Sequence, residues 1–406
     1  MQIDQFVKDA PGRLVAARHE ATPQYPASDY IAFIPHPLPP TLLMDTTLVR
    51  ALSDADRALG ELAGLGRAVP SPSLLIGPFV RREAVLSSKI EGTQTEIADL
   101  YAFEAGQPYL PGLRPPPPED DVQEVLNYVL ALDYGITRLA TLPIGLRLMR
   151  ELHAKLMDGV RGKDATPGVF RQSQNWIGAQ GTPVRAARFV PTPPYEMPQV
   201  LDAFEKYIHA DDEYPPLLRL GLIHYQFETI HPFIDGNGRI GRLLISLLLH
   251  AWELLPEPLL YLSAYFEHHQ AAYYDLLLGV STKGAWNEWL TFFLRGVTEQ
   301  SRDAARRAKQ LQDLQSTWRE QVAAVTGSGL PLRVIDHLFQ RPILTVRNVQ
   351  EMLGVKSYHT AQKYVQVLSD VGILTLRAEQ PVRRYEATAI LDCLIQRIAI
   401  FWRFVQ

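Results

Sequence analysis

The chain has 406 residues, of which 47% are hydrophobic and 21% charged, and its formal net charge at pH 7 is -4. This length and composition can bury a large core and indicate an ordinary soluble globular protein of two or three domains. Its one cysteine, Cys393, excludes an internal disulfide and favours a reducing compartment, the cytoplasm. The N-terminus lacks the features of a secretory signal, and the longest apolar stretch, residues 243–255, is too short to span a bilayer, so we expect no membrane segment.

The first part of the chain is rich in proline. Six prolines between residues 23 and 40 predict an extended arm rather than a helix. Apolar residues at three- and four-residue spacing then predict helices over about 45–62 and 79–86. The run Arg114-Pro115-Pro116-Pro117-Pro118 marks a boundary. We therefore assign residues 1–118 to an N-terminal arm and helical region.

The central domain, residues 119–297, is predicted to be mostly α-helical. Its helices are expected over residues 121–134, 146–157, 197–209, 217–229, 242–255, 270–278 and 286–295. Glycines, prolines and β-favouring residues over 162–194 interrupt the helical pattern and predict a hairpin. An amphipathic stripe over 304–322 predicts a further, connecting helix within residues 298–329.

The last part of the chain, residues 330–406, has a different pattern and a different charge. Helices are predicted over residues 332–339, 346–353 and 359–371, followed by strands over 373–376 and 383–386, which is typical of a winged helix. This part holds ten Lys and Arg against six Asp and Glu. A recognition helix from His359, with Arg383 and Arg384 on the wing, would suit DNA, and a protein-interaction module is the alternative.

The densest motif is His231-Pro232-Phe233-Ile234-Asp235-Gly236-Asn237-Gly238-Arg239-Ile240-Gly241-Arg242. Glycines that open a turn into a helix let backbone N–H groups bind phosphates. We expect Asn237 to donate to a phosphate oxygen, and Arg239 and Arg242 to supply guanidinium donors from one side of the helix.

Two residues of the same motif can take part in the chemistry. Asp235 suits Mg²⁺, which needs only one or two protein carboxylates, and His231 can take a proton near neutral pH. The motif therefore predicts phosphoryl or nucleotidyl transfer. A metal-hydrolase site built from His231, Asp235 and His224 is the alternative, although no HExxH spacing supports it.

This segment resembles the Fic motif, HxFx[D/E]GNGRxxR, and matches it at every specified position. The resemblance implies a Fic-type helical bundle over roughly residues 121–295 that transfers AMP from ATP onto a protein hydroxyl. It implies that His231 is the general base, that Asp235 holds Mg²⁺ and that Arg242 holds the γ-phosphate. The other cofactor-binding residues that it implies are Gly236, Asn237, Gly238, Arg239 and Gly241.

An upstream segment, Ser87-Ser88-Lys89-Ile90-Glu91-Gly92, resembles the family's inhibitory helix pattern, [S/T]xxxE[G/N], through Ser87, Glu91 and Gly92. A carboxylate that reaches Arg242 would form a charge-assisted pair and occupy the place of a γ-phosphate. The resemblance therefore implies an enzyme inhibited from its own N-terminal region. An ordinary exposed glutamate before a glycine cap is the alternative.

Two further segments resemble family features. The first, which includes Gly181, Thr182, Phe189 and Val190, resembles the β-hairpin flap that binds target segments by backbone pairing. The second resembles the nucleoside pocket, with Tyr265 and Tyr273 as candidate adenine contacts; here His269 stands where relatives commonly carry Asn. A surface hairpin and core aromatic residues are the respective alternatives.

The leading hypothesis is an autoinhibited adenylyltransferase that acts on Ser, Thr or Tyr hydroxyls of a target protein or of itself, with ATP and Mg²⁺. Transfer of another phosphate-containing group, or removal of AMP, by the same site is a variant of it. The alternative from another class is a DNA-binding regulator whose Fic domain senses ATP. The amphipathic connector and the family resemblance also suggest a homodimer.

Overall fold

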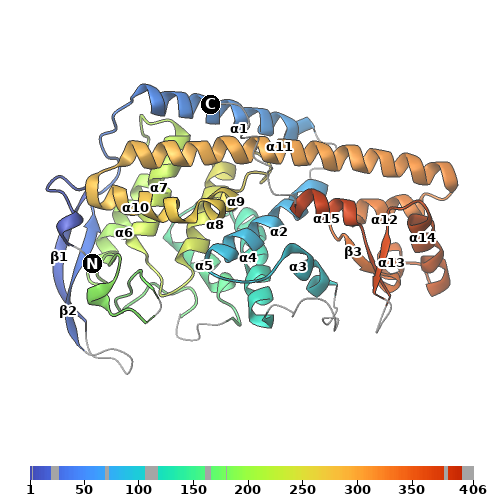
Figure 1. The fold of residues 1–406 in the computed structure, drawn as a ribbon, viewed down its shortest axis with the longest axis horizontal. Helices are drawn as coiled ribbons and strands as arrows, with labels where there is room; N and C mark the ends of the chain where they lie inside the picture. Colours follow the sequence, from blue (N-terminus) through green and yellow to red (C-terminus); the bar gives the residue numbers. More distant parts are fainter. Residues whose placement is uncertain are drawn as a thin grey trace, which may run out of the picture.

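We describe a computed structural model that covers residues 1, 3–19, 27–68, 73–105, 118–160, 166–179, 181–378 and 383–395. Most of the predicted proline boundary, residues 114–117, and part of the predicted hairpin, residues 162–165 and 180, lie outside the described residues. The described part is mostly helical, which confirms the predicted fold class (Figure 1). None of its helices is both long enough and apolar enough to cross a membrane.

The N-terminal segment forms a hairpin rather than an extended arm. After a short 3₁₀ turn, η1 (Ile3–Gln5), strands β1 (Gly12–His19) and β2 (Ser28–Pro35) pair antiparallel, with Gly12 opposite Pro35. β2 is the apolar strand of the pair and buries Ala32 and Phe33 completely. The prolines correctly predicted that this segment is not helical. The pairing of β1 with β2, which buries one face of β2, was not predicted.

Two long helices run side by side along one edge of the molecule (Figure 1). The first, α1 (Thr46–Ala68), begins after Asp45, whose carboxylate accepts hydrogen bonds from the backbone N–H groups of Thr47 and Leu48. The second, α11 (Trp286–Val325), is a single helix of 40 residues. The prediction of two helices here was wrong, because no residue between the two predicted segments ends the helix.

The remaining helices of the first 283 residues include α7, which packs against α6, α8, α10 and α11. They are α2 (Ser73–Ile90), α3 (Ile97–Glu104), α4 (Glu119–Arg138), α5 (Leu146–Leu156), α6 (Met197–His209), α7 (Pro216–Ile230), α8 (Asn237–Ala251), α9 (Ser263–His268) and α10 (Gln270–Lys283). α7 is buried on almost every side, which fits its nearly continuous apolar sequence. Helices α3 and α9 were not predicted.

The segment between α5 and α6 contains little regular structure. Its described residues, 157–160, 166–179 and 181–196, contain the 3₁₀ turn η3 (Val184–Ala186) and an isolated antiparallel bridge between Ile177 and Phe189, and no full hairpin. Phe33 of β2 donates a backbone hydrogen bond of 2.9 Å to the carbonyl oxygen of Val190. Val190 is fully buried, in a small apolar cluster with Tyr30 and Ala32. The N-terminal hairpin therefore supports this segment from behind.

The C-terminal unit, described over residues 330–378 and 383–395, contains four helices and a small antiparallel sheet in those ranges. Its elements are α12 (Leu330–Leu338), β3 (Ile343–Thr345), α13 (Val346–Leu353), α14 (Tyr358–Asp370), β4 (Thr375–Ala378), β5 (Arg384–Glu386) and α15 (Thr388–Ile395). The strand order is β3-β5-β4. This arrangement is compatible with the predicted winged helix, and β3 and α15 are additions to it. α15 leaves the unit and packs against α2 and α11 (Figure 1).

Candidate active site

The predicted motif forms the turn between α7 and α8. His231 follows the last residue of α7 in the left-handed conformation, with φ of 52°, and Gly236 has φ of 76°. α8 begins at Asn237, five residues earlier than expected, so its N-terminal N–H groups face the turn. The turn therefore has the form that the motif predicts for a phosphate-binding site.

Asn237 closes this turn on itself. Its side-chain Oδ1 accepts from the N–H of Phe233 and its Nδ2 donates to the oxygen of Phe233, each over 2.8 Å. We predicted that this side-chain amide donates to a phosphate oxygen. In the structure both of its polar atoms hold the shape of the loop, and donation to a phosphate oxygen stays a prediction.

Two residues that sequence reasoning missed also fix the loop. The guanidinium of buried Arg171 donates to the carbonyl oxygens of His231, Ile230, Ser173 and Thr192. The Nδ1 of His153 accepts from the N–H of Gly168, so its Nε2 donates to the oxygen of Asp235, over 3.0 Å. Their ligands are backbone oxygens from distant segments, and no local sequence pattern marks such contacts.

The imidazole of His231 is held in a form that can accept a proton. Its Nδ1 lies 3.2 Å from the oxygen of Glu228 and must donate to it, which leaves the lone pair on Nε2. Desolvation and, second, the charge of Arg171 lower the pKa of His231 to about 4. His231 is therefore neutral at pH 7 and able to act as a base.

Arg242, on α8, contacts two residues of α2 and of the segment that follows it. Its guanidinium lies 2.7 Å from Oε1 of Glu91, and it also donates to Oγ and to the backbone oxygen of Ser87. The Arg242 side chain is 2% exposed and that of Glu91 34% exposed. Burial disfavours the charged form of Glu91, but the charge and hydrogen bond of Arg242 outweigh it and lower the pKa of Glu91. The predicted contact between the upstream helix and the motif is present.

Gly238 is required for this contact. A Cβ atom added to Gly238 would lie 2.3 Å from Oε1 of Glu91 and 2.9 Å from Nη1 of Arg242. Glycine at this position therefore gives the Glu91 carboxylate room to reach Arg242 over the first turn of α8.

A cavity of about 670 Å³ opens over the turn. Of the residues predicted for the site, it is lined by Glu91, Phe189, His231, Asp235, Gly236, Asn237, Gly238, Arg242 and Tyr273. The predicted residues that do not line it are Ser87, Gly92, Gly181, Thr182, Val190, Arg239, Gly241 and Tyr265. The structure thus gathers the motif, the upstream glutamate and one flap residue around one space.

We expected Arg239 to project from the same side of the helix as Arg242. In the structure Arg239 does not line this cavity. Its buried guanidinium lies 3.0 Å from Oε2 of Glu124 on α4 and 3.8 Å from Oδ1 of Asp235. The two arginines are three residues apart, but one contacts α4 and the other α2. The Asp235 side chain is 56% exposed at the cavity, so its carboxylate is open to a ligand.

The two predicted tyrosines lie in different places. The hydroxyl of Tyr273 is 2.9 Å from Nε2 of His224, whose Nδ1 donates to the oxygen of Gly241. Tyr265 instead packs on Gly296 and Phe292 and lines a second cavity. Both nitrogens of buried His224 are thus engaged, and among the described residues no group of three or more His, Cys, Asp or Glu could hold a metal. The metal-hydrolase alternative has no support here.

Glu228, three residues before His231, is a further site residue that we did not predict. It lines the cavity, and its buried Oε1 has no hydrogen-bond partner in the described structure. Burial raises the pKa of Glu228 to about 7 against the attraction of Arg242. The cavity therefore contains two carboxyl groups near Arg242, of which only Glu91 is hydrogen-bonded to it.

Two known family models match the segments that form this site. Residues 143–249 match the Fic/DOC family, and residues 49–137 match the Fic/DOC family N-terminal region. The chain is a Fic-domain protein. The motif from His231 to Arg242 lies within the matched Fic domain, whereas Glu91 lies within the matched N-terminal region. The two groups that meet at Arg242 thus come from two separately matched parts of the Fic protein.

Known Fic proteins resemble the chain over different lengths. It is 32% identical to the protein adenylyltransferase Fic of Drosophila grimshawi over 133 residues, and 31% identical to that of Drosophila virilis over the same number. These matches cover 32% of this chain and 25% of each relative, so the chain spans about a quarter of the curated relatives it matches. A Fic family protein from Desulfovibrio desulfuricans G20 shares the fold, with a TM-score of 0.56 and 19% identity over 86% of this chain and 98% of that one.

Proposed function

We propose that this protein is a protein adenylyltransferase that moves AMP from ATP onto a hydroxyl group of a target protein. The observation that carries this proposal is the cavity in which neutral His231, the phosphate-binding turn and Arg242 face one space. The names of its relatives, protein adenylyltransferase Fic, support the same reaction.

The reaction assigns a task to each group. His231 takes the proton of a Ser, Thr or Tyr hydroxyl at Nε2, and the hydroxyl oxygen attacks the α-phosphorus of ATP. The bond between the α-phosphorus and the bridging oxygen breaks, AMP remains on the target, and pyrophosphate leaves. The N–H groups at the start of α8, with Arg242, bind the phosphates and stabilise the developing charge.

Mg²⁺ fits the same site. Asp235 offers one carboxylate that is 56% exposed at the cavity, and Mg²⁺ is bound by one or two carboxylates together with substrate phosphates. Bound there, the ion would neutralise phosphate charge. The lack of a larger acidic cluster among the described residues is compatible with this mode of binding.

We also propose that the resting enzyme is inhibited by Glu91. Its carboxylate is bound to the guanidinium of Arg242, which is the group proposed to hold the γ-phosphate. A carboxylate and a phosphate oxygen compete for the same donors, so ATP binds productively only after Glu91 leaves.

Incubation of the wild-type protein and the Glu91→Gly variant with α-labelled ATP and Mg²⁺ tests both proposals. We expect roughly tenfold or more label on protein with Glu91→Gly, because loss of a charge-assisted contact is worth about 1.5–3 kcal/mol. The His231→Ala change in the same background should abolish the label, and γ-labelled ATP should give none. If Glu91→Gly labels no protein, including itself, AMP transfer is wrong.

A second function, DNA binding by the C-terminal unit, is favoured by one feature. The first turn of α14 exposes Tyr358 and His359, with Lys356 just before them and Lys363 farther along the helix. We propose that this face contacts DNA, and a salt-dependent gel shift with the whole protein tests it. If the DNA migrates equally with and without the protein at low salt, this proposal is wrong.

A further inference from the structure

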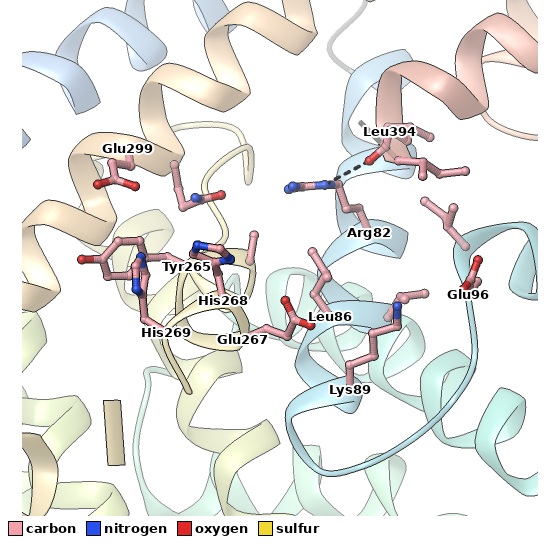
Figure 2. Close-up of a pocket in the computed structure, with 15 residues that line it drawn as sticks. Arg82, Leu86, Lys89, Glu96, Tyr265, Glu267, His268, His269, Glu299 and Leu394 are labelled. Carbon is pink, nitrogen blue, oxygen red and sulfur yellow. Dashed lines mark hydrogen bonds between the residues drawn. The ribbon is translucent and has the colours of Figure 1, made fainter. Parts of the chain in front are cut away.

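Glu228 lines the active-site cavity but has no task in the proposed reaction. Its buried Oε1 has no hydrogen-bond partner in the described structure, and such an oxygen is destabilising. The carboxyl groups of the second cavity, those of Glu96, Glu267 and Glu299, are exposed or half-buried, where water can solvate them (Figure 2). A buried carboxyl oxygen without a partner thus lies where the proposed substrate binds, which indicates that its partner is a ligand.

The Glu228 carboxyl packs against a glycine of α8. A Cβ atom added to Gly241 would lie 2.3 Å from Oε1 of Glu228, just as one added to Gly238 would lie 2.3 Å from Oε1 of Glu91. Gly238 and Gly241 are three residues apart, so they lie on the same side of α8 and roughly 4.5 Å apart along its axis. The two carboxyl groups therefore lie one after the other against α8, nearly one helical turn apart.

Arg242 links these two places. It follows Gly241 directly in the chain, and its guanidinium is bound to Glu91. In the proposed reaction the same guanidinium holds the γ-phosphate of ATP after Glu91 leaves. A phosphate group bound there would lie within reach of the Glu228 carboxyl, which comes next along the same side of α8.

The surroundings of Glu228 hold its carboxyl between the protonated and the charged form. Burial disfavours the carboxylate, Arg242 of α8 attracts it, and the charge of Glu91, which follows α2, disfavours it too. The pKa of Glu228 is raised to about 7 as a result. Tyr273 and Tyr274 of α10 line the same cavity, and both stay uncharged near pH 7 because burial raises their pKa.

A bound polyphosphate would favour the protonated form of Glu228. About one turn to either side of it in the chain, His224 and His231 are neutral at pH 7, since burial lowers the pKa of each, to about 3 and about 4. A phosphate that replaces Glu91 on Arg242 brings more negative charge than Glu91 did, which raises the pKa of Glu228 further. A protonated carboxyl can donate one O–H to a phosphate oxygen, whereas a carboxylate would repel it.

We propose that Glu228 is a phosphate-binding residue, which takes up a proton when ATP binds and donates a hydrogen bond to the phosphate that Arg242 holds. This inference rests on the proposed function, because it takes Arg242 as the group that holds the γ-phosphate. It makes the affinity for ATP depend on pH. Glu228 has the higher pKa in the ATP-bound form, so binding is strongest below the pKa of the free form and weakens as the pH rises from there to the pKa of the bound form.

The binding of ATP with Mg²⁺ to the full chain, measured by isothermal titration calorimetry, tests this inference. The parent protein carries Glu91→Gly and His231→Ala, so that Glu91 does not compete with ATP and no AMP is transferred. Titrations in two buffers that differ in ionisation enthalpy count the protons taken up for each ATP bound. At about pH 7.5 we expect the parent to take up roughly half a proton more than the parent with Glu228→Gln, whose amide does not titrate.

Glu299→Gln is the matched control. Glu299 lines the second cavity rather than that of Arg242, and burial raises its pKa as well, so its change should leave proton uptake as in the parent (Figure 2). From about pH 6 to about pH 8 the affinity of the parent for ATP should fall roughly fivefold or more. With Glu228→Gln the affinity should stay nearly constant over this range, because an amide N–H also donates to phosphate and carries no charge.

The same titrations with AMP, which has no γ-phosphate, show which part of the nucleotide Glu228 meets. Glu228→Ala should weaken the binding of ATP and leave that of AMP unchanged. Equal losses for ATP and AMP would place the carboxyl at the nucleoside and overturn the inference, as would equal proton uptake with and without Glu228→Gln. If uptake depends on Glu228 but Glu91→Gly transfers no labelled AMP, only AMP transfer is wrong. A parent that binds no ATP would overturn both.

Discussion

At the scale of single residues, the site separates groups that the motif places next to one another. Arg242 faces the inhibitory glutamate, Arg239 pairs with Glu124 on α4, and Asn237 is bound to the backbone of its own loop. Arg242 can meet a phosphate only by giving up its contact with Glu91. If Arg242 holds the γ-phosphate as proposed, binding of ATP displaces Glu91, while Arg239 and Asn237 keep their contacts with Glu124 and with the loop.

The pH dependence of transfer follows from His231. Its pKa is lowered to about 4, so the imidazole is neutral above that pH and accepts a proton; as pH falls through about 4 it becomes charged and the base is lost. We expect Glu91→Gly to show an acid limb near 4 instead of the usual value of about 6.5. The charge of Glu91 raises the pKa of His231, so removal of Glu91 should not shift the acid limb to higher pH.

A control is needed because Glu228, with a pKa of about 7, lies in the same cavity. Any step near pH 7 should vanish in Glu228→Gln, while the limb near 4 should stay. An NMR titration of the labelled His231 ring in the same variants reports its pKa independently of activity. A midpoint of about 6.5 in that titration would mean that the ring is solvated and that the environment of His231 described here is wrong.

The sequence predicted this site well where the contacts are local. The motif from His231 to Arg242 forms one turn, so its backbone geometry follows from the positions of its glycines. Arg171 and His153 could not be found in this way, because each binds backbone oxygens of a segment distant in the chain. Every residue has a backbone carbonyl oxygen, so the sequence does not indicate which of them accepts a hydrogen bond. A partner side chain such as Glu91 is visible in the sequence.

At the scale of elements, the end of α7 depends on one side chain. Arg171 donates to four carbonyl oxygens, two of which, those of Ile230 and His231, lie at the end of α7. We expect Arg171→Met to lower the free energy of unfolding by about 3 kcal/mol, because it leaves several buried acceptors without a donor. Urea denaturation followed by circular dichroism measures this loss.

Arg150→Met is the matched control for that experiment. Arg150 lies on the neighbouring α5 and its exposed side chain donates to the single carbonyl oxygen of Gly168. Its loss should change the free energy of unfolding by about 1 kcal/mol or less. Equal effects of the two changes would show that the carbonyl cluster around Arg171 does not stabilise the turn.

Element boundaries were predicted best where a cap or a loop ends the helix. α6 matches its predicted range because Ala210 is extended, and α7 ends within a residue of expectation because His231 is left-handed. α11 was divided in error, since a polar stretch in a helix does not end it without a cap or a proline. α15 was not predicted, although its described residues include the buried Ile390, Leu391 and Leu394 at helical spacing.

At the scale of the whole molecule, α11 joins the helices around the His231 turn to the C-terminal unit. Its 40 residues extend roughly 60 Å, and they pack beside α7, α9 and α10 before reaching α12 and α15. Far along it, Trp318 is buried, with its ring 5.7 Å from that of Phe339, the residue that follows α12. The orientation of the C-terminal unit toward α2 therefore depends on this aromatic contact.

Trp318→Ala should loosen the C-terminal unit without unfolding α7 and α8. Loss of a buried tryptophan typically costs about 3–5 kcal/mol, and here that loss falls on the packing of α12 against α11. We expect hydrogen exchange over residues 330–395 to become at least a hundredfold faster, while residues 217–251 of α7 and α8 keep their protection. If α7 and α8 lost protection to the same degree, the C-terminal unit and these two helices would unfold together as a single cooperative unit.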